Sequence, residues 1–274
     1  MAHRARTAGK AMRRNALGGF LTIGVLWGVT QAQEPQTDTN DTWAARAQAG
    51  YSKTGGTTDT SSANALFHIA FLVDKWKFLF ATEGLYGSTR GETTAEAWNV
   101  RGQANYNFTD RLYWYAGFGY IDDRFSGFAY QAVLSTGLGY QIIKTDDTKL
   151  TAQLGVGPRW LKPQMLTLDS VGAIVSVTDL PTQTDAVLDA AANLEHSFNS
   201  ATKFIAGVTV HAGNDNTMTT AVAQLQVKMR EGLSLAAGYQ WTHNSQPPAG
   251  VGSSSSLTTL NLVYEHKNPK LAPE

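Results

Sequence analysis

The chain has 274 residues, of which 42% are hydrophobic, a mean hydropathy of −0.23, and 22 basic against 22 acidic residues. This composition, with 26 glycines, suits an all-β protein rather than a helical membrane protein. The balanced charge argues against the basic surface of a nucleic-acid-binding protein. The absence of cysteine excludes disulfides, thiolate metal sites, a lipid anchor on cysteine and a cysteine nucleophile.

The N-terminus has the pattern of a cleaved signal peptide. Five basic residues lie within the first 14, an apolar run follows at 16–29, and Thr-Gln-Ala ends the segment at 30–32. A run of about 14 apolar residues is shorter than the ~20 that a spanning helix needs, which disfavours the alternative of an anchoring helix. We expect removal of residues 1–32, leaving 17 basic and 22 acidic residues, and a polar spacer at 33–41.

The segment from Trp98 to Phe108 alternates between two kinds of side chain. Its even positions are apolar, aromatic or glycine, whereas the odd positions include Asn99, Arg101 and Gln103. A period of two with aromatic residues at both ends is typical of a strand that crosses a bilayer with one side toward lipid. Beyond residue 32 no apolar run reaches 18 residues, so any membrane crossing must use strands.

The same alternation recurs along the chain and predicts twelve strands. They are expected at 42–52, 62–72, 76–87, 94–108, 112–122, 127–143, 149–161, 186–198, 202–213, 217–229, 233–244 and 256–266. Short connections alternate with mostly longer ones, of which 162–185 is the longest. We therefore predict an antiparallel, up-and-down transmembrane β-barrel at 42–266, with the short turns and both termini in the periplasm and a periplasmic tail at 267–274.

Tryptophan supplies an independent indication of the membrane boundaries. Every tryptophan after the signal segment falls on the outward-facing parity and near a strand end. Indole rings prefer the headgroup region, so two girdles in contact with outer-membrane lipid and lipopolysaccharide are expected, which the alternative of a soluble β-sandwich would not need. The girdle residues are Trp43, Trp76 and Trp114 on the turn side and Trp98, Trp160 and Trp241 on the loop side.

The inward parity collects amides and charges of both signs. Because strong ion selectivity requires rings of one charge sign, this mixture predicts a narrow, weakly selective passive pore for ions or small solutes. The same side chains could fill the lumen by pairing and make a structural barrel, and the 162–185 connection could fold inward or lengthen a hairpin. The candidate lumen residues are Arg46, Gln48, His68, Glu83, Asn99, Arg101, Gln103, Asn105, Gln131, Arg159, Asp189, Glu195 and Lys228.

No motif predicts catalysis, a cofactor or a metal. His211 with Asp215 is the nearest approach to a catalytic pair, but no serine is obviously in register with it, so a hydrolase is the least favoured class. The acidic pairs at 122–123 and 146–147 lack the alternating oxygen positions of a calcium loop. We expect a non-enzymatic protein without a cofactor.

Several short motifs, in order along the chain, resemble the salt-induced outer-membrane protein family, also called YdiY-like. They are DKW at 74–76, GETTAE at 91–96, TDRLY at 109–113, DRFSG at 123–127, GLGYQ at 137–141, GVGPR at 155–159 and NSQPPAG at 244–250. The resemblance implies an outer-membrane barrel inserted by the barrel-assembly machinery, a link to salt or osmotic stress, and no catalytic residues. Such proteins usually end on an aromatic residue, whereas here ten residues follow Tyr264.

Overall fold

The computed structural model describes residues 41–54, 60–169, 174–214, 216–248 and 251–269. Every regular element in these ranges is a β-strand, and none of the described residues forms a helix long and apolar enough to cross a membrane. The predicted signal peptide at 1–32 and the spacer, apart from its last residue, lie outside the described ranges.

Twelve of the strands form a closed antiparallel barrel, which confirms the predicted fold class. Sequential neighbours pair along the chain, β7 pairs with β9, and β13 closes the ring against β1. The strands are β1 (Asp41–Thr54), β2 (Thr60–Val73), β3 (Trp76–Thr89), β4 (Glu92–Asn107), β5 (Leu112–Asp123), β6 (Phe128–Lys144), β7 (Thr148–Leu168), β8 (Ile174–Asp179), β9 (Gln183–Ser197), β10 (Thr202–Gly213), β11 (Thr217–Arg230), β12 (Leu233–Asn244) and β13 (Ser254–Pro269).

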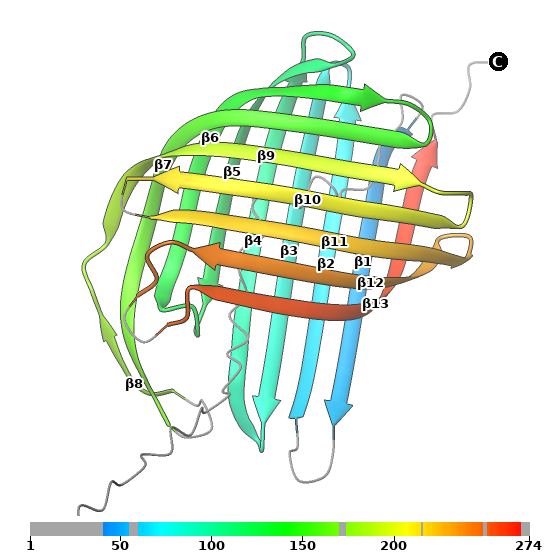
Figure 1. The fold of residues 1–274 in the computed structure, drawn as a ribbon. Coiled ribbons are helices and arrows are strands. Elements are labelled where there is room, and N and C mark those ends of the chain that lie inside the picture. The colour runs from blue at the N-terminus through cyan, green and yellow to red at the C-terminus, as the bar shows by residue number, and fades with distance from the viewer. Residues whose placement is uncertain (1–40, 55–59, 170–173, 215, 249–250, 270–274) are drawn as a thin grey trace, which may run out of the picture.

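The last strand forms a corner of the barrel. Its first part, 254–264, pairs with β12, and its second part, 262–269, pairs with β1. In Figure 1, β9–β12 cross in front of the wall made by β1–β5, and β13 turns from one wall to the other. The strand runs three residues past the predicted boundary at 266, so part of the predicted tail is paired with β1.

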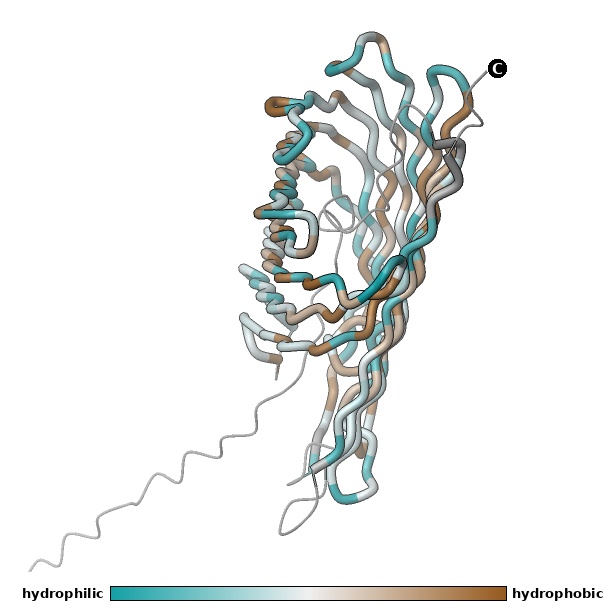
Figure 2. The backbone as a smooth tube through the Cα atoms, turned by 90° about the vertical axis from the view of Figure 1, so that its right-hand side faces the viewer, coloured by the Kyte–Doolittle hydropathy of each residue, from teal (hydrophilic) through white to brown (hydrophobic). Residues whose placement is uncertain are grey.

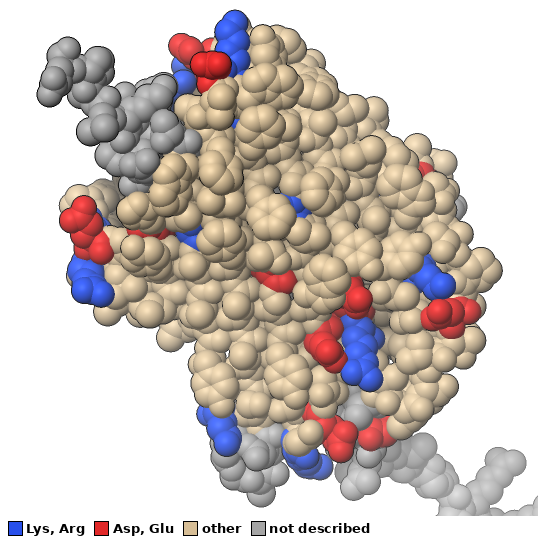
Figure 3. All heavy atoms as spheres, turned by 180° about the vertical axis from the view of Figure 1, so that it is seen from behind, with Lys and Arg blue, Asp and Glu red and all other residues tan. Residues whose placement is uncertain are grey.

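The barrel is apolar outside and largely polar inside. On β11 the inward Gln224 and Gln226 are buried, whereas the outward Leu225 and Val227 are 44% and 43% exposed. The same alternation of hydropathy follows the tube in Figure 2, and Figure 3 shows a broad uncharged face with charged side chains mostly toward its margins. Exposed aliphatic and aromatic side chains on every wall are what a surrounding lipid phase requires.

Aromatic side chains gather near both ends of the strands. At the turn end the Trp76 ring contacts Tyr106 edge-on at 5.1 Å and Trp114 at 6.4 Å between centroids. At the loop end Trp98 lies 5.3 Å from Tyr120. All six tryptophans of the predicted girdles alternate with buried or half-buried inward residues, so they occupy the outward register. This is the placement expected of interfacial aromatic belts.

The 162–185 connection lengthens a hairpin. The end of β7 continues past the barrel wall and pairs with β8 over 164–168 and 174–179, and Figure 1 shows β8 set away from the barrel. The apolar stretch 171–175 lies in this connection. Its first three residues lie outside the described ranges, and Val175 is 63% exposed, so that residue does not pack against the barrel.

Candidate functional site

The candidate site is the lumen, where the predicted inward residues can be located one by one. All but one of the thirteen are buried or half-buried on the inward register. The exception is Lys228, which is exposed at the turn end of β11 and therefore lies at the rim rather than inside. The polar interior is organised into two charged clusters with an amide-rich cavity between them.

The first group, which we call the seam cluster, comprises Arg46, Glu265, Gln226 and Lys203 from β1, β13, β11 and β10. Arg46 Nη1 lies 2.6 Å from Glu265 Oε1, and Arg46 Nη2 donates to Gln226 Oε1 at 2.9 Å. Lys203 Nζ donates to the same carboxylate at 3.1 Å. The Arg46 side chain is 1% exposed, and a guanidinium remains charged in proteins, so its burial depends on these partners.

Gln48 connects the seam cluster to the cavity. Its amide oxygen either accepts from Asn261 Nδ2 at 3.3 Å or, with the amide turned over, from Arg46 Nε and Nη2 at 2.8 and 3.0 Å. Because a guanidinium only donates, the second orientation satisfies both side chains better. Gln48 therefore supports Arg46 from the cavity side.

The second group, the loop-end cluster, comprises Arg159, Asp185, Asn216, Asp189 and His211. Arg159 binds Asp185 through two parallel bonds, Nε to Oδ1 at 3.1 Å and Nη2 to Oδ2 at 2.6 Å, and also donates to the Asn216 carbonyl at 2.9 Å. His211 Nδ1 lies 3.6 Å from Asp189 Oδ1. Such a bidentate pair fixes both side chains in one geometry.

The predicted partner of His211 is not seen. Asp215 lies outside the described residues, and the carboxylate that faces His211 belongs to Asp189 on the neighbouring strand β9. Sequence separation hides this pair, because the two residues meet only through the β9–β10 register. Among the described residues, no three histidines or carboxylates gather in a way that could hold a metal.

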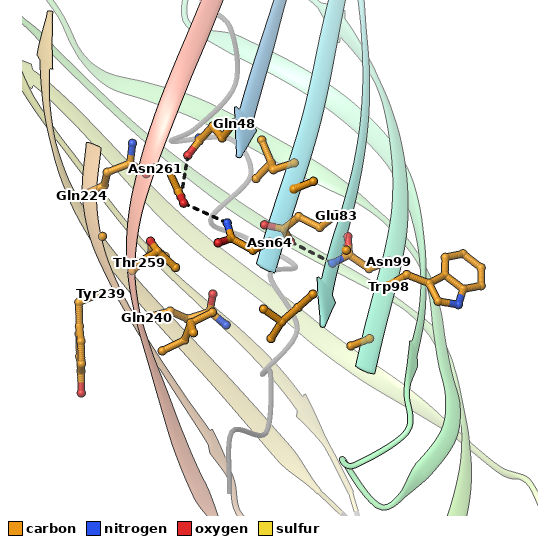
Figure 4. Close-up of a pocket in the computed structure, with 18 of the residues that line it drawn as sticks. Gln48, Asn64, Glu83, Trp98, Asn99, Gln224, Tyr239, Gln240, Thr259 and Asn261 are labelled. Carbon is orange, nitrogen blue, oxygen red and sulfur yellow. Dashed lines mark hydrogen bonds between the residues drawn. The ribbon is translucent and has the colours of Figure 1, made fainter. Parts of the chain in front are cut away.

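Between the clusters lies a cavity that is partly open to solvent. Its polar lining is shown in Figure 4: Glu83 accepts from Asn99 Nδ2 at 2.9 Å, and Asn64 Nδ2 donates to Asn261 Oδ1 at 3.1 Å, while Trp98 points away from the cavity. Arg101 Nη2 lies 3.3 Å from Glu83 Oε2. Aliphatic side chains complete the lining, namely Leu66, Leu85, Ile121, Val222 and Leu257.

Two acidic residues of the clusters, Glu265 and Asp185, were missing from the sequence-based set. Glu265 follows the outward Tyr264, so continuing the alternation by one residue would have placed it inside. Asp185 has the parity of the buried Val187, but it was assigned to the long connection rather than to a strand. Glu265 lay within the predicted strand 256–266 but was not counted as inward, whereas Asp185 lies one residue before the predicted strand 186–198.

These features define a β-barrel membrane protein with a polar, ion-paired lumen. The chain belongs to the family described as "Protein of unknown function, DUF481", which matches residues 47–266. It is similar to the uncharacterized protein YdiY of Escherichia coli (strain K12), with 25% identity over 217 residues, covering 79% of this chain and 80% of that protein.

Solved barrels resemble the chain more distantly. The NanC porin is 12% identical with a TM-score of 0.42 and covers 83% of this chain and 100% of its own. The CymD monoaromatic hydrocarbon channel is 10% identical with a TM-score of 0.42, covering 88% of this chain and 91% of its own. At these levels of similarity, the function of this chain has to be argued from its own lumen.

Proposed function

We propose that this chain is an outer-membrane barrel that acts as a narrow, weakly selective passive pore for ions or small hydrophilic solutes. The observation that carries the proposal is the amide-lined cavity inside the barrel, between the seam cluster and the loop-end cluster. A polar interior behind an apolar outer wall is the arrangement of a water-filled passage. Periplasmic termini and a role in salt stress are further parts of this proposal.

Weak selectivity follows from the way the lumen charges are compensated. Arg46 and Lys203 share the carboxylate of Glu265, and Arg101 faces Glu83. Arg159 is bound to Asp185. Since no ring of one sign results from these pairs, neither cations nor anions gain a strong advantage.

A structural barrel with a filled lumen is the second candidate. It is favoured by the seam cluster, whose bonds from β1 and β13 reach to β11 and β10 and leave Arg46 almost inaccessible. Bonds of this kind narrow the lumen. The two candidates differ in one measurable property, namely whether the lumen passes current.

Single-channel recording in planar bilayers tests the proposal. We expect small conductance steps for the wild type and a shift toward cation preference in Arg101→Glu and Arg159→Glu, whereas the same change at the exposed rim residue Arg124 has little effect. The double variant Arg46→Ala/Glu265→Ala should conduct more, because it removes the seam cluster. Absence of steps in both the wild type and this double variant would reject the pore and leave the structural barrel.

A further inference from the structure

We infer that the cavity is a binding site for a small, uncharged, polyhydroxylated solute such as a sugar or polyol. The inference rests on the proposed pore function and names the class of solute that the passage favours. It is argued from the chemistry of the lining, from one buried acceptor without a partner, and from a glycine that makes room for an amide pair.

Amide and hydroxyl side chains dominate the polar lining, and they come from many strands. A primary amide presents two donors and an acceptor at one position, and a sugar hydroxyl likewise donates and accepts, so the two groups match without any charge. The amides and the hydroxyl lie on β1, β2, β4, β11, β12 and β13, and they are Gln48, Asn64, Asn99, Gln224, Gln240, Thr259 and Asn261.

Charge is nearly absent from this lining. Among the described residues that line the cavity, Glu83 is the one acidic or basic side chain. It accepts from Asn99 at 2.9 Å and faces Arg101 at 3.3 Å, so its charge is compensated within the wall. Because a free ion would have to leave water without meeting an opposite charge, the cavity favours a neutral solute.

Asn99 offers an acceptor to a ligand. Its side chain donates through Nδ2 to Glu83, while its Oδ1 has no hydrogen-bond partner among the described residues. The residue is 7% exposed and lines the cavity, as Figure 4 shows. Buried polar atoms are normally partnered. Asn99 Oδ1 is closed to water in this structure, so a turn of the side chain toward the cavity would let an entering hydroxyl supply the missing donor.

Gly50 makes room for the amide pair beside it. Asn64 of β2 donates to Asn261 of β13 across β1, and Gly50 lies beneath this bond. A Cβ at Gly50 would lie 2.6 Å from Asn64 Oδ1 and would collide with Asn261 Oδ1. The aliphatic residues of the lining, such as Leu66 and Leu257, provide surface for the C–H groups of a sugar ring.

A proteoliposome swelling assay with three solutes of similar size and different charge tests the inference. The probes are glucose, gluconate and glucosamine, which are neutral, negative and positive at neutral pH. We expect glucose to enter fastest, and we expect Asn99→Leu and Gln240→Leu each to slow its entry by about two- to tenfold, the effect of losing one hydrogen bond. Gln183→Leu, an exposed amide outside the lining, is the matched control.

The outcomes separate this inference from the proposed pore. Entry of gluconate or glucosamine as fast as glucose, or ion conductance without glucose entry, overturns the inference and leaves the pore intact. Unchanged glucose entry in both leucine variants also overturns it. Failure of all three probes together with absence of conductance overturns the pore as well. Heat-modifiable electrophoretic mobility reports whether each variant is folded, and either variant alone suffices for the comparison.

Discussion

Glu265 binds two cationic side chains at the junction of the first and last strands. Its carboxylate lies 2.6 Å from Arg46 Nη1 and 3.1 Å from Lys203 Nζ. Arg46 is buried, whereas the carboxylate retains some solvent contact. Removing one partner of a buried ion pair leaves the other charge uncompensated, and this costs more than the pair itself contributes.

We therefore expect Glu265→Gln to lower the free energy of unfolding by about 3 kcal/mol, the low end for a buried pair because Glu265 is partly exposed. Urea unfolding of the barrel in detergent or liposomes measures this. Glu96→Gln, which breaks the exposed pair with Arg124, is the control and should cost less than about 1 kcal/mol. Equal losses in the two variants would show that Arg46 does not depend on Glu265.

Parity predicted the direction of individual side chains but not their partners. Arg101 and Asn99 were placed inside by alternation alone, and both are buried there. The partner of Arg46 is 219 residues away, and its second contact, Gln226, is 180 residues away. Such pairs depend on strand register and barrel shear, which a period-two pattern does not specify.

At the level of elements, polar side chains connect the two strands of the β7–β8 hairpin. Gln164 Nε2 donates to Asp179 Oδ1 at 2.7 Å, and Lys162 Nζ lies 3.4 Å from Asp179 Oδ2. The hydrogen bond from Gln164, followed by the interactions with Lys162, holds the pKa of Asp179 below its usual value of 3.8. A lowered pKa means that these contacts favour the hairpin above pH 3.8 and are lost as the pH falls through the lowered pKa.

Carbon-13 NMR of the Asp179 carboxyl group tests these contacts. We expect a titration midpoint below 3.8 in the wild type. Gln164→Leu and Lys162→Met should each raise the midpoint, because both side chains lower the pKa of Asp179. A wild-type midpoint at or above 3.8 would contradict the contacts of the hairpin.

The barrel strands were predictable, and β8 was not, for one physical reason. A strand between lipid and lumen must alternate, as Trp98 to Phe108 does, whereas a strand beyond the membrane has no such requirement. From Val175 to Asp179 every residue of β8 is exposed, on both faces. Backbone pairing and the contacts of Asp179 with Gln164 and Lys162 hold it against β7, and none of these leaves a hydropathy signal.

For the whole molecule, short turns and longer loops separate to opposite ends of the barrel. The turn around Asp110 joins β4 to β5, and the loop at 245–253 joins β12 to β13 at the other end. The even strand count and this asymmetry were readable from the sequence, because loop lengths and strand periods are local properties. The contents of the lumen were not, because they depend on which strands face each other.

Cysteine labelling tests the proposed orientation, and the natural chain has no cysteine to interfere. A membrane-impermeant maleimide should label Gly252→Cys in intact cells, because the residue is exposed on a long loop. Among the described residues, a side-chain carbon there would contact the Ser254 carbonyl alone, at 3.8 Å. Asp110→Cys, exposed on a short turn, should label only after lysis. The reverse result would place the termini outside the cell.

The bond between Arg46 and Glu265 also bears on the order of biogenesis. Arg46 enters with the first strand, and its hydrogen-bonded carboxylate arrives only with the last. Until β13 pairs with β1, the Arg46 guanidinium lies in the interior of an incomplete barrel without the Glu265 carboxylate. The incomplete sheet is therefore an unfavourable intermediate. Completion of the ring then brings backbone pairing and charge compensation in one step, which makes insertion more nearly all-or-none.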